Sequence, residues 1–191
     1  MEPTTQPGGP LQQGQTLDPE YLRLFREHLR GQQSLILGAL AGAGAAFLGA
    51  IMWAGISYIS GYQIGFLAIA IGMLVGYAIA SLGRGIDKIY GWMGGGFSLL
   101  GVIAGNLFTV AVYITQAEEM PIWEVGFLML LNPGLTLEIM MDTFSPMDLL
   151  FYGLAIYYGY RSSFRKVTTR DEAAFRQHLN PGRALNEHTL G

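Results

Sequence analysis

Three long apolar stretches without a charged residue dominate the pattern of this chain, at residues 35–59, 64–82 and 92–115. About 20 apolar residues cross a bilayer core of about 30 Å, so each stretch predicts a transmembrane helix. A fourth apolar stretch, over residues 145–161, is shorter and richer in tyrosine, with Asp148 near its start and Arg161 at its end. Its opening residues Ser-Pro-Met-Asp are typical of a helix start. The pattern therefore predicts an all-α polytopic membrane protein with four transmembrane helices.

The segment before the fourth span has a different pattern. Residues 121–142 hold two short apolar runs separated by Asn132, Pro133 and Gly134, which together form a strong turn signal. Each run is too short to cross a bilayer. We expect a broken helical hairpin here, which either lies in the outer interface of the membrane or re-enters the membrane from that side.

The two ends of the chain are polar. Residues 1–17 are rich in Pro, Gln, Gly and Thr, which predicts a disordered tail and no cleaved signal. Residues 18–31 predict an amphipathic juxtamembrane helix, capped by Asp18, that lies on the membrane surface or continues the first span. The tail over residues 163–191 includes a short predicted helix from 171 to 179, stopped by Asn-Pro-Gly at 180–182.

Two short sequences near the ends resemble each other. Residues 25–29 read Phe-Arg-Glu-His-Leu, and residues 175–179 read Phe-Arg-Gln-His-Leu. If both segments lie on the same side of the membrane, they could pair or bind anionic lipid. A chance similarity over five residues is the competing interpretation.

The distribution of charge predicts an orientation. All 11 basic residues lie before the first predicted span, between the second and third, or after the fourth. The loop after the third span is instead acidic, with Glu118, Glu119, Glu124, Glu138 and Asp142. Cytoplasmic loops carry an excess of Lys and Arg. With four spans, both termini and the middle loop are therefore predicted to be cytoplasmic.

Small residues recur every four positions along three of the spans. Such ridges let helix backbones approach closely in lipid. One interpretation is packing between spans of one chain. The other leaves one ridge free for a homo-oligomer interface. The candidate packing residues are Gly38, Gly42 and Ala46 in the first span, Ala68, Gly72 and Gly76 in the second, and Gly101 and Gly105 in the third.

Four polar residues are candidates for a functional site. Asn106 lies deep in the third span, where an amide is costly unless it is paired. It would bond to Ser57, Thr109 or a tyrosine hydroxyl as a link between helices, or line a polar path. The carboxylates of Glu138, Asp142 and Asp148 would bind a cation, dock a partner or form a solvated acidic face.

Several classes of chemistry lack support in the sequence. The chain has no cysteine, and its three histidines lie outside the predicted spans. The run Gly94–Gly96 lacks the Gly-Lys-Ser/Thr ending of a phosphate-binding loop and indicates close helix packing. We therefore predict no catalytic residue, no cofactor, no metal site and no nucleic-acid partner.

Two stretches carry a resemblance to a known group of proteins. One runs from Ile64-Gly65-Phe66 through the 84–89 loop to Asn106, and the other covers residues 144–150 and 155–160. Together they resemble a group of small bacterial membrane proteins of unknown function, over roughly residues 60–165. The resemblance implies a bacterial inner membrane, and no activity or functional residue is carried over from it.

Three functions are consistent with these features. A non-enzymatic scaffold or accessory subunit fits best, with the bilayer and either a second copy or another membrane protein as partner. An oligomeric channel or transporter for a small solute or ion is the first alternative. A membrane enzyme that acts on lipid at the outer face is the second.

Overall fold

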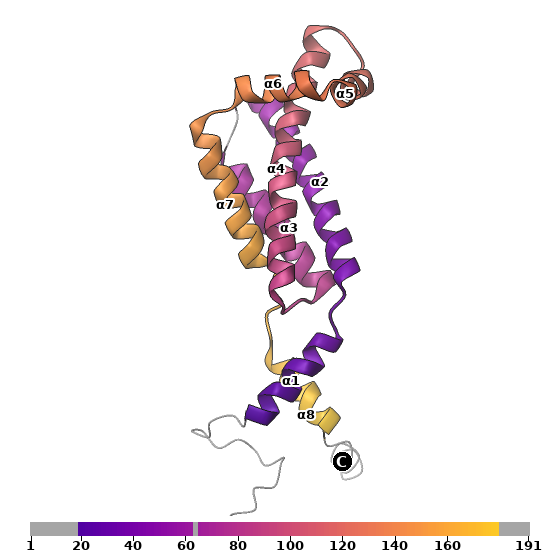
Figure 1. Cartoon of the computed structure of the whole chain (residues 1–191), viewed down its shortest axis with the longest axis vertical. Coiled ribbons are helices and arrows are strands. Elements are labelled where there is room, and N and C mark those ends of the chain that lie inside the picture. Colours follow the sequence, from indigo (N-terminus) through magenta and orange to yellow (C-terminus); the bar gives the residue numbers. More distant parts are fainter. Residues whose placement is uncertain (1–18, 63–64, 180–191) are drawn as a thin grey trace, which may run out of the picture. The chain divides into compact units, whose positions relative to one another are not determined.

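A computed structural model describes residues 19–62 and 65–179, and every regular element in this part of the chain is an α-helix (Figure 1). Two compact units are present. One holds α1 and α8, and the other, Gln33–Arg165, holds α2 to α7. The helices are α1 (Pro19–Gly31), α2 (Leu35–Ser60), α3 (Phe66–Gly83), α4 (Lys88–Ala117), α5 (Ile122–Leu131), α6 (Pro133–Thr143), α7 (Pro146–Ser162) and α8 (Thr169–Leu179).

Helices α2, α3 and α4 are long and apolar enough to cross a membrane, with 26, 18 and 30 residues. This confirms the first three predicted spans. Helix α4 starts four residues before the predicted span, because Asp87 takes the extended backbone of an N-cap residue. At 1.5 Å per residue, α4 is about 45 Å long and extends beyond a bilayer core of about 30 Å.

Helix α7 is the fourth helix of the bundle, and it packs against both α3 and α4 (Figure 1). Its 17 residues make it about 26 Å long. It begins as predicted, with a capping box. The Ser145 hydroxyl accepts from the Met147 amide, and Asp148 Oδ2 accepts from the Ser145 amide at 2.8 Å. The cap satisfies amide donors that a helix start otherwise leaves without partners.

Replacing Ser145 by alanine should destabilise the start of α7. The substitution removes a hydroxyl acceptor at the N-cap, which typically costs about 1 kcal/mol. We expect a lower midpoint of thermal unfolding in mild detergent, measured by circular dichroism. Ser60→Ala, which removes an exposed hydroxyl that bonds to the backbone of Tyr62 after the end of α2, is the control and should lower the midpoint less than the Ser145 change.

The bundle has an up-down topology that brings three chain segments to one end. The Ser34 amide donates to the Gly83 carbonyl at 2.9 Å, and the Arg165 amide donates to the Gly85 carbonyl at 2.8 Å. The start of α2, the loop 84–87 and the end of α7 therefore meet, and we call this the loop end. Four basic residues lie here, at positions 84, 88, 161 and 165.

The opposite end carries the α5–α6 hairpin, and we call it the hairpin end. Helices α5 and α6 meet at Asn132 with a bend of 103°, which confirms the predicted broken pair. Figure 1 shows the pair running across the end of α4. Within the hairpin only Val125 is buried. Its large apolar side chains are exposed: Ile122, Trp123, Phe127, Leu128, Leu130, Leu131, Leu135, Leu137 and Met141.

The predicted small-residue ridges lie at the helix contacts inside the bundle. A Cβ atom on Gly72 would lie 2.6 Å from the Ala155 carbonyl oxygen of α7, and one on Gly101 would lie 3.2 Å from the Ala46 Cα of α2. All eight candidate packing residues are buried between helices of the same chain. Around them, Ile79, Val75 and Val102 form the fully buried core.

The unit of α1 and α8 is held by aromatic contacts. Phe175 is 3% exposed, and its ring centroid lies 5.2 Å from the Phe25 ring and 5.5 Å from the Tyr21 ring. The two similar sequences thus pair with each other. Helix α1 ends at Gly31 and Ser34 caps α2 separately, so α1 is not a continuation of the first span. Asp18 and residues 180–182 lie outside the described residues.

Candidate functional site

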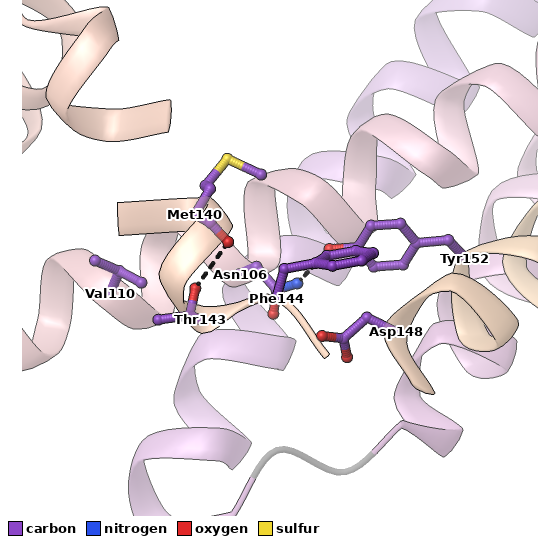
Figure 2. A pocket seen from close by; sticks show the side chains of 7 residues that line it. All are labelled: Asn106, Val110, Met140, Thr143, Phe144, Asp148 and Tyr152. Carbon is purple, nitrogen blue, oxygen red and sulfur yellow. Dashed lines mark hydrogen bonds between the residues drawn. The ribbon is translucent and has the colours of Figure 1, made fainter. Parts of the chain in front are cut away.

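A small pocket lies at the hairpin end, between α4, α6 and α7 (Figure 2). It is built by residues that lie up to 46 positions apart in the sequence. Its lining comes from helices α4 and α7 and from the end of α6. The lining residues are Asn106 and Val110 from α4, Met140, Thr143 and Phe144 from the end of α6, and Asp148 and Tyr152 from α7.

Asn106 links α4 to α7. Its Nδ2 donates to the Tyr152 hydroxyl oxygen at 2.6 Å, while its Oδ1 is buried without a hydrogen-bond partner among the described residues. Of the three predicted partners, a tyrosine hydroxyl is the one found. Thr109 instead donates to the carbonyl of Gly105 on its own helix. The amide is thus half satisfied, and Asn106 is one of the residues that line the pocket.

Asp148 lies one helical turn before Tyr152, so both side chains reach the pocket from one face of α7. One oxygen of the Asp148 carboxylate caps α7, as described above, and the side chain is half-buried. Figure 2 shows the carboxylate turned toward the side of the pocket on which Asn106 and Thr143 lie. The Phe144 and Tyr152 rings meet edge to face, with centroids 6.2 Å apart.

The structure brings together two of the four predicted polar residues. Asn106 and Asp148 line the same pocket, whereas Glu138 and Asp142 are exposed on α6 and are not part of its lining. Sequence reasoning missed Met140, Thr143 and Phe144, because the turn signal at Asn132 predicts a break but not the direction in which α6 runs after the bend of 103°. The spacing of four between Asp148 and Tyr152 was the one available signal.

The surroundings of the pocket are acidic. No Lys, Arg or His occurs from residue 89 to residue 160, while six acidic residues do. Asp148 therefore has no basic residue within 12 positions on either side. Among the described residues, no group of three or more His, Asp or Glu side chains could hold a metal ion. The site thus carries negative charge without the ligand number of a metal centre.

The bundle interior carries no reactive constellation in the part of the chain that the structure describes. Its buried polar side chains are hydroxyls, Ser57, Ser98, Thr109 and Ser163, and no Asp, Glu, Lys or Arg is buried there. Ser98 and Ser163 donate to carbonyls of their own helices at 2.6 and 2.7 Å. The arrangement can bind a hydrogen-bond donor in the pocket, and it offers no nucleophile paired with a base.

Comparison of the chain with protein-family models, with curated proteins and with solved structures finds no match. The functional argument below therefore uses the chain's own residues.

Proposed function

We propose that this chain is a non-enzymatic integral membrane protein that acts as a scaffold or accessory subunit of a membrane assembly. The observation that carries the proposal is the contrast between its interior and its hairpin end. The interior is closed by helix contacts, whereas the hairpin presents a large apolar surface with almost no cover from its own chain.

The closed interior favours a structural role over conduction. A Cβ on Gly76 would lie 2.9 Å from the Gly159 carbonyl oxygen, and one on Gly105 would lie 2.8 Å from the Trp53 ring. Spans that approach this closely leave little room for a hydrated path between them. Intramembrane charges usually mark ion and proton paths, and the described residues of the bundle hold none that is buried.

The apolar hairpin favours a partner in the membrane. Trp123 and Leu130 are 72% and 77% exposed, and α5 is apolar on nearly all sides. The bend of 103° prevents α5 and α6 from acting together as one straight span. Large exposed apolar patches mark interaction or membrane surfaces. A hairpin of this kind can rest in the bilayer and present its remaining surface to another membrane protein.

We further propose a bacterial inner membrane with both termini cytoplasmic. The loop end carries Arg84, Lys88, Arg161 and Arg165. All charged residues in the segment 89–160 are acidic. This asymmetry matches the excess of basic residues on the cytoplasmic side. The choice of a bacterial inner membrane is supported by the resemblance described in the sequence analysis.

A channel or transporter is the second candidate, and the pocket is the observation that favours it. A polar pocket that contains a carboxylate, at one end of a helical bundle, would suit the entrance of a conduction path for ions or solutes in an oligomer. Reconstitution of the isolated oligomer in liposomes tests this function. Solute or ion flux that changes in Asn106→Leu would support it, and absence of flux from every oligomer would remove it.

The scaffold proposal is tested by cross-linking in native membranes, followed by purification in mild detergent and mass spectrometry of the retained proteins. We expect a second membrane protein in fixed ratio. The double variant Trp123→Ala/Leu130→Ala should lower its recovery at least about tenfold, because truncation of buried aromatic anchors typically costs 2 kcal/mol or more.

A matched control is available on the first span. Phe47 and Leu48 of α2 are also exposed, at 57% and 59%. The double variant Phe47→Ala/Leu48→Ala should leave recovery of the partner unchanged if the hairpin is the docking surface. Recovery of copies of this chain alone would contradict the scaffold proposal.

A further inference from the structure

The pocket at the hairpin end gathers hydrogen-bond acceptors and few donors. Asn106 Oδ1 is buried and has no partner among the described residues, and the Asp148 carboxylate uses one oxygen for the helix cap. The Thr143 hydroxyl donates to the Ile139 carbonyl at 2.9 Å, so its proton is already used. This wall therefore offers acceptors to a ligand group that donates hydrogen bonds.

The charge of the surroundings selects a cation. Asp148 is the acidic residue of the pocket lining. No basic residue between positions 89 and 160 is available to balance it. The exposed Glu138 and Asp142 on α6 add negative charge at the same end of the bundle. A concave site of one sign raises the local concentration of ions of the opposite sign.

The ligand set suits an ammonium group better than a metal ion. Calcium takes six to eight oxygen ligands, and magnesium requires a near-octahedral oxygen shell. The pocket instead combines one carboxylate, one amide oxygen and the rings of Phe144 and Tyr152. Aromatic rings attract organic cations, and the two oxygen acceptors match N–H donors. A primary ammonium group carries both a positive charge and three N–H donors, so it matches the oxygens and the rings in kind.

The place of the pocket points to a lipid as the source of that group. It lies where α4 and α7 meet the end of α6, and α4 is long and apolar enough to cross a bilayer. In the orientation proposed above, this end of the bundle is the one that faces the outer headgroups. Large apolar side chains next to the pocket are exposed and available to acyl chains: Met141, Met147, Leu149 and Leu150.

We propose that this pocket binds the primary ammonium of an aminophospholipid headgroup, with Asp148 and Asn106 as its acceptors. The Asp148 carboxylate supplies the charge, and the free Asn106 Oδ1 supplies a buried acceptor. The inference stands independently of the scaffold role, because it concerns a lipid and requires no protein partner.

The first experiment compares lipids on the unmodified full chain. The protein is reconstituted in nanodiscs that contain phosphatidylethanolamine, phosphatidylcholine and phosphatidylglycerol with the same acyl chains, and retained lipids are counted by native mass spectrometry. We expect at least about tenfold preference for phosphatidylethanolamine over phosphatidylcholine, because a trimethylated nitrogen cannot donate a hydrogen bond. Equal retention of the two lipids would overturn the proposal.

Two further experiments identify the molecule that supplies the ammonium group and the residues that bind it. Free ethanolamine should not displace the lipid at millimolar concentration. Displacement would assign the site to a free amine and overturn the lipid assignment. The variants Asp148→Asn and Asn106→Leu should abolish the preference between the two lipids, while Asp142→Asn, an acidic change outside the pocket lining, should preserve it.

Folding controls accompany the variants. Asn at position 148 keeps an oxygen that can accept from the Ser145 amide, so the cap of α7 can persist. The unfolding temperature of each variant reports this directly. An unchanged lipid preference in folded Asp148→Asn would show that the pocket does not hold the ammonium, and the comparison of lipids on the wild-type chain stays decisive if the variant unfolds.

Discussion

Replacing Gly94 by alanine is expected to destabilise the bundle by about 1–3 kcal/mol or more, which is the usual cost of forcing an extra methyl group into a packed interior. The new Cβ would collide with the Ser163 hydroxyl oxygen and the Gly159 carbonyl oxygen of α7. A flexible side chain can turn away, whereas a backbone carbonyl moves only with its helix. Helix α7 must therefore shift away from α4.

Unfolding in mild detergent, followed by circular dichroism against temperature or denaturant, measures this effect. Gly96 is the matched control, because it lies on the same helix and a Cβ there would meet no atom within 4 Å. Alanine is a better helix former than glycine by about 1 kcal/mol. Gly96→Ala should therefore be neutral or slightly stabilising. Equal behaviour of the two variants would show that α4 and α7 do not approach each other as closely as described.

Single cysteines should label from opposite sides of the membrane, which gives a nearly all-or-none result. The chain has no cysteine, so each variant carries one thiol. In intact cells, an impermeant maleimide should react with Met120→Cys at the hairpin end. The same maleimide should react with Ile86→Cys at the loop end only after the cells are permeabilised. The physical basis is the concentration of Lys and Arg at the loop end.

Both replaced residues are uncharged, so neither variant alters the charge bias that is under test. Reaction after full denaturation shows that each thiol is present and reactive. The reversed pattern would overturn the proposed orientation and leave the four-helix fold intact. Labelling of both positions from one side would contradict the up-down topology itself.

The sequence predicted the fold because lipid imposes simple length and polarity rules. Three charge-free runs became α2, α3 and α4, and the turn signal at Asn132 became the break between α5 and α6. The fourth helix was found through the cap at Ser145 and Asp148, although its tyrosines weaken the apolar signal. In each case a local pattern sufficed, because an intramembrane helix satisfies its own backbone.

The candidate site was predicted only in part, because it depends on contacts between distant segments. Asn106 stood out as a polar residue in an apolar run, yet nothing local identified Tyr152, 46 positions away, as its partner. The extension of α4 back to Lys88 was also missed. A hydropathy pattern shows where the apolar residues of a span end. The helix itself can continue through polar residues such as Lys88 until it reaches its cap.

The contact between α1 and α8 also has a consequence for how the chain is made. Phe25 leaves the ribosome about 150 residues before Phe175, the residue that covers it. At about 5–20 residues per second, that interval lasts roughly 8–30 s. Throughout it, the aromatic face of α1 lacks Phe175 while the helices of the bundle are synthesised. The unit of α1 and α8 can therefore close only after Phe175 has been synthesised, which is after all helices of the bundle have been made.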